Sequence, residues 1–108
     1  MLLDKVIYLF PTLGSDIEKL NYLKVGIYII KGWIRQSRNV SSEASYREHA
    51  SLKQYKDLGR FETNSRNSWV YNIRNYIREL QNVGVIGMSD LEDLRKELTA
   101  IIEEVGSM

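Results

Sequence analysis

The sequence predicts an all-α fold: a single-domain bundle of four or five helices that covers residues 1–108. Apolar residues recur at helical spacing along most of the chain, and only one proline interrupts it. Ser15 and Ser89 each precede an apolar periodic stretch and are followed three positions later by a glutamate, which is the spacing of a capping box and marks the start of a helix. A chain of 108 residues, 44% of them hydrophobic, can bury one modest core.

The first expected helix covers residues 2–10 and ends before Pro11, because proline disfavours helical backbone in the residue that precedes it. The second begins at Asp16, since Ser15 and Glu18 form a capping box. This helix carries two apolar stripes, which predicts a central helix that is packed on both sides. The first stripe is Ile17, Leu20, Leu23, Ile27, Ile30 and Ile34, and the second is Tyr22, Val25, Ile29 and Trp33.

The alternative is an α+β fold with strands near residues 5–10 and 24–34. Valine, isoleucine and tyrosine favour strands, and they are frequent in both segments. Gly26 and Gly32 weaken a helix there by about 1 kcal/mol each relative to alanine. The capping box and the length of the periodic stretch favour the helix.

Two further helices are expected in the middle of the chain, after a polar loop or frayed helix end at residues 36–45. Residues 43–58 carry few apolar side chains, so this helix should lie on the surface, and Gly59 ends it. The next helix covers residues 66–82 and ends at Gly84. Its apolar face consists of Trp69, Ile73, Ile77 and Leu80.

The last helix is expected to begin after Ser89, which forms the second capping box with Glu92. Its apolar stripe has a spacing that serves either an intramolecular core or a second copy of the chain. The stripe consists of Leu91, Leu94, Leu98, Ile101 (or Ile102) and Val105. The preceding connector is short, with Val85 and Ile86 as an apolar plug, so the last two helices are predicted to pack as an antiparallel hairpin.

Composition excludes several classes of function. The chain has no cysteine, which removes disulfides, thiolate nucleophiles and sulfur-bound metals. One histidine cannot build an imidazole metal site alone, and the glycine loops of nucleotide-binding proteins are absent. We therefore expect no enzyme activity, no cofactor and no bound metal. No targeting signal or membrane-length apolar segment is visible, so the expected location is the cytoplasm.

Charge is unevenly placed along the chain, although the net charge is only +1. Residues 31–66 hold eight basic and four acidic residues, whereas residues 67–108 hold four basic and seven acidic residues. Lys31, Arg35 and Arg38 form a first basic row at helical spacing, and Arg66, Arg74 and Arg78 form a second row. With aromatic residues between them, the two rows predict a binding surface. This surface consists of Lys31, Trp33, Arg35, Arg38, Tyr46, Arg47, Lys53, Tyr55, Arg66, Arg74 and Arg78.

The segment "HASLK", residues 49–53, resembles the signature of histidine-containing phosphotransfer domains. These are four-helix bundles that present one histidine on an exposed helix face, so the resemblance implies His49 as a phosphoacceptor. The chain departs from the signature, because Lys53 follows the histidine by four residues rather than three. Gln54 then stands where a small residue is usual. The competing interpretation is an exposed histidine that takes no part in chemistry.

Because no catalytic constellation is visible, the sequence favours a small intracellular binding module. We expect an accessory, regulatory or inhibitor protein of the kind that microbes and phages encode in short genes. Immunity proteins and antitoxins are analogous in size and composition. The expected partner is an acidic protein, and RNA or DNA binding by the same surface is the alternative. Self-association through the stripe of the last helix is a further hypothesis.

Overall fold

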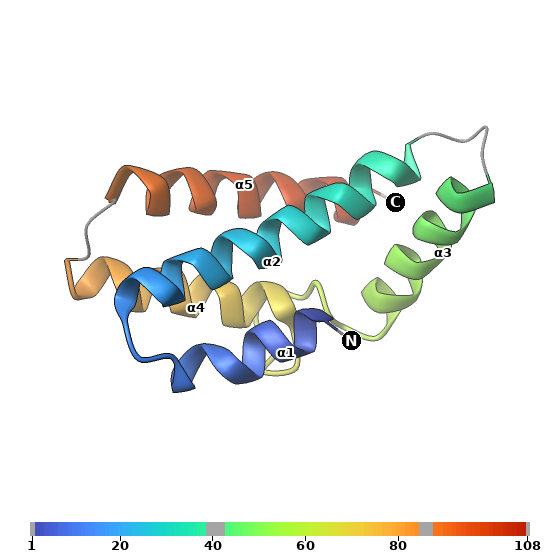
Figure 1. Cartoon of the computed structure of the whole chain (residues 1–108). Coiled ribbons are helices and arrows are strands. Elements are labelled where there is room, and N and C mark those ends of the chain that lie inside the picture. The colour runs from blue at the N-terminus through green and yellow to red at the C-terminus, as the bar shows by residue number, and fades with distance from the viewer. Residues whose placement is uncertain (1, 39–42, 85–87, 108) are drawn as a thin grey trace.

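The chain folds as a bundle of α-helices, which confirms the predicted fold class (Figure 1). A computed structural model describes residues 2–38, 43–84 and 88–107, and no residue within these ranges is in a strand. The alternative with strands near residues 5–10 and 24–34 is wrong, because both segments are helical. The elements in chain order are α1 (Leu2–Leu9), the 3-10 helix η1 (Phe10–Thr12), α2 (Asp16–Ser37), α3 (Glu43–Asp57), α4 (Trp69–Asn82) and α5 (Met88–Gly106).

Three helices, α2, α4 and α5, lie side by side and form the centre of the bundle (Figure 1). α4 and α5 run in opposite directions, which confirms the predicted hairpin, whereas α2 and α5 run in the same direction. α1 packs antiparallel to α2 and also contacts α4. α3 packs against the C-terminal half of α2 and leans away from the other helices, as expected of a surface helix (Figure 1).

The core forms where the buried face of α2 meets α4 and α5. Five of the six residues in the first predicted stripe of α2 are buried. Ile17 is exposed, because it lies about 60° further round the helix than Leu20. The second stripe is covered only in part: Val25 is exposed, so the prediction that α2 is packed on both sides is wrong at that residue. Leu91, Leu94, Leu98, Ile101 and Val105 of the predicted α5 stripe are buried inside the chain, and the alternative member Ile102 is half-buried, so the stripe offers little apolar surface to a second copy.

Helix ends follow local chemistry, with two departures from the sequence prediction. The Ser15 hydroxyl accepts a hydrogen bond from the Glu18 backbone N–H at 3.2 Å, which confirms the first predicted cap. α5 begins at Met88, so the second predicted cap is wrong and Ser89 lies inside the helix. α4 begins only at Trp69, with the buried Ser68 hydroxyl as its N-cap.

Two predicted stop signals are confirmed by the backbone. Gly59 and Gly84 have φ angles of 79° and 68°, in the left-handed region that glycine adopts without strain. They follow the ends of α3 and α4 directly. The predicted apolar plug, Val85 and Ile86, lies outside the described residues.

An aromatic cluster joins α2, α3 and α4. Trp33 of α2 and Tyr55 of α3 are half-buried and stack with ring centroids 6.1 Å apart. Both rings also contact the buried Trp69 of α4, and Phe61 packs edge-on against that indole at 5.7 Å. Aromatic pairs of this geometry add about 0.5–1.5 kcal/mol beyond their burial. With Leu52, which is fully buried, this cluster holds α3 to the bundle.

α1 is fixed to α4 by three polar and aromatic contacts. The Trp69 indole N–H donates to an Asp4 carboxylate oxygen at 2.8 Å, and the Tyr76 hydroxyl donates to the Ile7 carbonyl at 2.9 Å. The Tyr76 ring stacks on Phe10 with centroids 3.9 Å apart. Burial, together with the nearby Glu79 carboxylate, raises the pKa of the Tyr76 hydroxyl. This phenol therefore stays a hydrogen-bond donor throughout the physiological pH range.

Gly26 lies where α2 passes closest to α1. A Cβ at this position would meet methyl groups of Val6 and Leu3 at 3.4 and 3.6 Å, which is ordinary contact. We expect Gly26→Ala to raise the free energy of unfolding by about 0.5–1 kcal/mol, because alanine favours the helix and its methyl group fits. Chemical denaturation measures the change. Gly26→Leu should lower stability by overpacking, and a stabilising leucine would contradict this account of the contact.

Candidate functional site

The first predicted basic row lies in one groove between α2 and α5. Lys31, Arg35 and Arg38 all line this groove, which has a volume of about 260 Å³ and a floor of Ile34 and Ile101. The helical spacing therefore places the three cations together, as the sequence predicts. We call this the ladder groove, because two of the three cations are paired across it.

Three ion pairs join α2 to α5 at a constant offset of 66 residues. Lys24 and Lys31 approach Asp90 and Glu97 at 3.1 and 3.0 Å, and Arg38 pairs with Glu104. Successive pairs are seven residues apart on both helices, or about 10 Å along the axis. A constant offset requires helices that run in the same direction, so the pairs follow from the parallel packing of α2 and α5.

Two of these ion pairs neutralise part of the basic charge of residues 31–66 with acidic residues of the same chain. The acidic residues of the C-terminal helix neutralise Lys31 and Arg38, while Arg35 forms no ion pair with another described residue. The charge asymmetry that suggested an external partner is thus partly an internal match between α2 and α5.

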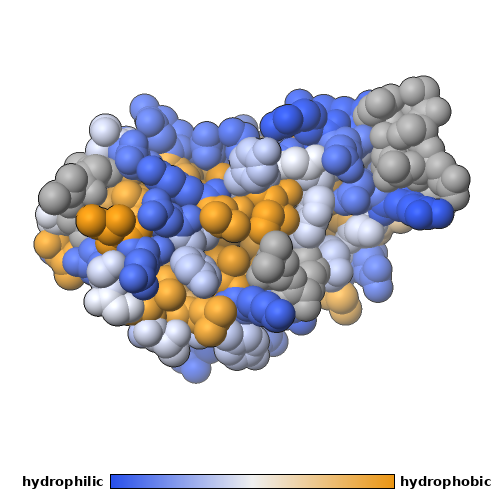
Figure 2. Space-filling view, viewed as in Figure 1, coloured by the Kyte–Doolittle hydropathy of each residue, from blue (hydrophilic) through white to orange (hydrophobic). Residues whose placement is uncertain are grey.

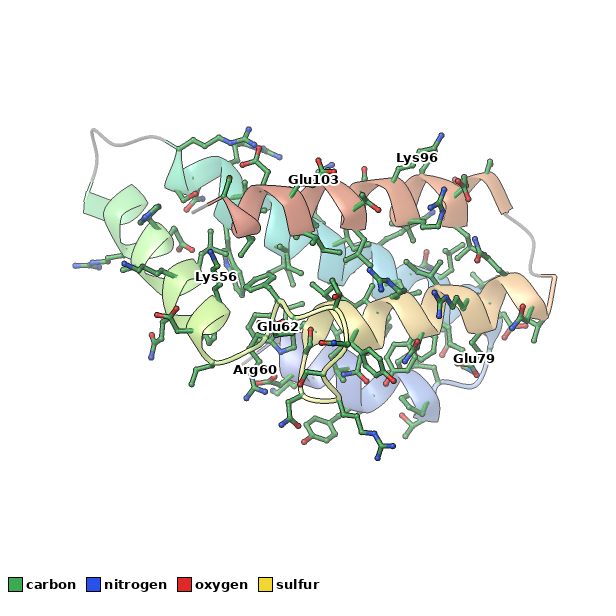
Figure 3. The ribbon with its side chains drawn as sticks, turned by 180° about the vertical axis from the view of Figure 1, so that it is seen from behind. Lys56, Arg60, Glu62, Glu79, Lys96 and Glu103 are labelled. Atoms are coloured by element: carbon green, nitrogen blue, oxygen red, sulfur yellow. The ribbon has the colours of Figure 1, made fainter. Side chains whose placement is uncertain are left out.

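The second basic row lies in a different groove, between α4 and α5. Figure 3 shows the molecule from the side on which α4 and α5 lie in front of α2. Arg74 and Arg78 of α4 line this groove together with Arg95 of α5. Its volume is about 270 Å³, and none of its described lining residues is acidic. We call it the arginine groove. The remaining lining residues are Ile77, Gln81, Leu98, Thr99 and Ile102.

Arg95 has one carboxylate partner outside this lining. Its guanidinium donates to Glu92, one turn earlier on α5, and this hydrogen bond lowers the pKa of the Glu92 carboxyl. The pair is solvent-exposed, so it orients Arg95 more than it stabilises the helix.

Arg66 does not belong to the second row, contrary to the sequence prediction. It precedes α4, because that helix begins at Trp69 and not at residue 66. Arg66 lines a separate hollow of about 420 Å³ with Arg60 and the exposed ring of Tyr8. This Tyr8 hollow lies between α1, the segment that joins α3 to α4, and α4 itself.

The other predicted residues are spread between the core and α3. Trp33 and Tyr55 belong to the aromatic cluster, so much of their surface is used inside the fold. Arg47, His49 and Lys53 are exposed on α3, remote from the arginine groove. The side chain of Tyr46 lies outside the described residues. The phosphoacceptor hypothesis for His49 stays a prediction.

Comparison with known proteins finds no match. Neither a family model, nor a curated protein, nor a solved structure is similar to this chain. In the described part of the chain, no helix is long and apolar enough to cross a bilayer. Within the same part, no cluster of histidine, aspartate and glutamate side chains has the arrangement of a metal site.

Sequence reasoning missed Arg95 as a partner of Arg74 and Arg78. The sequence did contain a signal for it, because each helix lines the arginine groove with an arginine and with the residues three, four and seven positions after it. On α4 these are Arg74, Ile77, Arg78 and Gln81, and on α5 they are Arg95, Leu98, Thr99 and Ile102. Two such stripes meet when antiparallel helices pack through adjacent faces.

We expect the ion pairs between α2 and α5 to contribute little to stability and more to the axial alignment of the two helices. In a double-mutant cycle of Lys31→Gln and Glu97→Gln, we expect a coupling energy of about 0.2–1 kcal/mol, since both side chains are half-exposed. Urea denaturation at low salt measures it, and 1 M salt should reduce it by screening. A coupling energy of zero at low salt would show that the pair does not form in solution.

The Glu92 carboxyl gives a direct probe of Arg95. Its pKa is lowered in the folded chain, so the pair stabilises the fold above the unfolded carboxyl's pKa and ceases to do so as pH falls through the folded value. We expect carbon-detected NMR titration to give a lower midpoint in the wild type than in Arg95→Gln. Identical midpoints would mean that Arg95 points elsewhere.

Proposed function

We propose that this protein is a small non-catalytic binding module of accessory, regulatory or inhibitor type inside the cell, and that the arginine groove takes an acidic segment of a protein partner. The observation that carries the proposal is the combination of three guanidinium groups with an apolar floor in one groove. Guanidinium groups form paired hydrogen bonds with carboxylates. Ile102, which is only partly buried, gives an apolar side chain of the same segment a place to lose water.

The dimensions of the arginine groove suit a short occupant. Each wall extends over seven residues, or about 10 Å of helix. This length accommodates about two turns of a helix or a few extended residues. Amphipathic segments bind in grooves of this kind through apolar anchors at helical spacing, with charges at the edge. An acidic amphipathic helix would place its carboxylates beside the arginines and an apolar side chain against Ile102, the one apolar lining residue that is only partly buried.

The surroundings of the groove favour a protein segment over a nucleic acid. α5 carries six acidic and only two basic residues. Glu103 lies with Lys96 along the outer edge of this helix (Figure 3). A phosphate backbone that extends beyond the groove would meet this negative charge, whereas a short peptide would not.

Nucleic-acid binding is the second candidate, and the Tyr8 hollow is the observation that favours it. The Tyr8 ring is 79% exposed and lines the same hollow as Arg60 and Arg66. An exposed aromatic ring beside two guanidinium groups can stack a base and bind its phosphate. The carboxylate of Asp4 also lines this hollow and opposes phosphate there, although it is engaged with Trp69.

The proposal is tested with labelled peptides of defined composition. Fluorescence anisotropy compares a glutamate–leucine amphipathic peptide with a lysine–leucine peptide of the same pattern and with a single-stranded RNA. We expect the acidic peptide to bind best, and Arg78→Glu to weaken it at least tenfold, or about 1.4 kcal/mol. Stronger RNA binding that Arg66→Glu abolishes would favour the second candidate instead.

Arg35→Glu is the matched control, because it makes the same charge change in the ladder groove. We expect this variant to retain wild-type peptide affinity. Equal losses for Arg35→Glu and Arg78→Glu would show that net charge, and not the arginine groove, governs binding. No binding of the acidic peptide by the wild type would overturn the proposal.

A further inference from the structure

The outer face of α2 is apolar and uncovered. Ile17, Val25 and Tyr28 are 60%, 48% and 72% exposed, on the helix that also forms the centre of the core. Figure 2 shows apolar surface over α1 and α2 on this side of the molecule. Exposed apolar surface grouped on one helix marks an interaction site more often than scattered exposed residues do.

These residues form one continuous seam. Ile17, Asn21, Val25, Tyr28 and Gly32 follow one another at intervals of four, four, three and four residues, which is the spacing of a helix–helix interface. The seam spans about 22 Å of α2. Gly32 lies within it, and nothing approaches within 4 Å of the place where its Cβ would stand. A second backbone can therefore come close at this point.

The charge along α2 indicates what covers the seam. Asp16 and Glu18 are exposed in the first turn of the helix and Arg35 is exposed in its last turn, whereas Lys19 and Lys31 are paired with Glu79 and Glu97 inside the chain. A helix with an acidic start and a basic end is complementary to a second copy of itself in the antiparallel direction. The helix dipoles are opposed in the same arrangement.

We propose that two copies of this chain associate through the seam of α2, antiparallel, with the two-fold axis between Gly26 and Ile27. In this register Val25 lies level with Tyr28 of the second copy, and Asn21 lies level with its Gly32. Glu18 lies level with Arg35 of the second copy at each end. The arginine groove is lined by α4 and α5 alone, so this association is independent of the proposed function.

The absence of cysteine from the sequence allows a test of the register itself. In the double variant Asn21→Cys/Gly32→Cys, we expect a disulfide between the copies after mild oxidation, because the two positions are level across the axis. In either single variant the two identical cysteines are separated by about 16 Å along the helix, which a disulfide cannot span. Non-reducing electrophoresis distinguishes these results. No cross-link in the double variant, or equal cross-links in the singles, would overturn the proposal.

Sedimentation equilibrium of the unmodified chain gives the second readout. We expect a dimer whose dissociation constant rises at least tenfold in Tyr28→Lys. The control is Val83→Lys, which removes an equally exposed apolar side chain outside α2 and should leave the dimer unchanged. Circular dichroism verifies that both variants fold. A wild type that remains monomeric at millimolar concentration would overturn the proposal, and so would equal effects of the two substitutions.

Discussion

The structure depends on the burial of one face of α2. Leu20, Leu23, Ile27, Ile30 and Ile34 bring α4 and α5 onto this helix, and each buried side chain contributes about 1.5–3 kcal/mol. The other elements attach to what this face organises. α1 reaches α2 where Gly26 leaves room for its side chains, and α3 docks through the aromatic cluster beside the far end of the same helix. Loss of the stripe would therefore remove the packing of α2 on α4 and α5, around which the other elements are arranged.

Charge has a different role on the two sides of α5. On the side that faces α2, acidic residues of α5 pair with basic residues of α2 at a constant offset along the chain. These pairs favour one axial alignment of the two helices, in addition to the alignment that the apolar core favours. Toward α4, cations from both helices meet without a carboxylate in the groove. Arg95 is paired with Glu92 outside the groove, whereas Arg74 and Arg78 form no ion pair with another described residue. The arginine groove is for this reason the surface where binding would return stability to the fold.

Helix existence and type could be predicted from the sequence because periodicity and capping act locally. The Ser15 cap, the ends at Gly59 and Gly84, and the antiparallel hairpin of α4 and α5 all depend on neighbours within a few positions or on one short connector. Arg66 was misplaced because the N-cap that decides the start of α4 is Ser68, and the buried setting of that serine depends on its hydrogen bond to the Arg60 carbonyl. A shift of the helix start by two residues, from position 90 to Met88, likewise moved Ser89 inside α5.

Contacts between helices were beyond sequence reasoning, since they depend on which faces meet. The grouping of Lys31, Arg35 and Arg38 was predictable from spacing within one helix. Their neutralisation by α5 was not, because it depends on packing between segments 66 residues apart in the chain. Arg95 could have been placed beside α4 from the matching residue spacing on the two helices of the predicted hairpin.

The aromatic cluster has a consequence for how this protein can be observed. Both tryptophans of the chain belong to it, with ring centroids 6.1 Å apart, so intrinsic emission originates from a single place. Release of α3 would expose the Trp33 indole to water and shift its fluorescence emission to longer wavelength. Changes at the connection between α4 and α5 would leave the emission unchanged. Tryptophan fluorescence therefore reports on the end of the molecule where α3 packs and not on the opposite end.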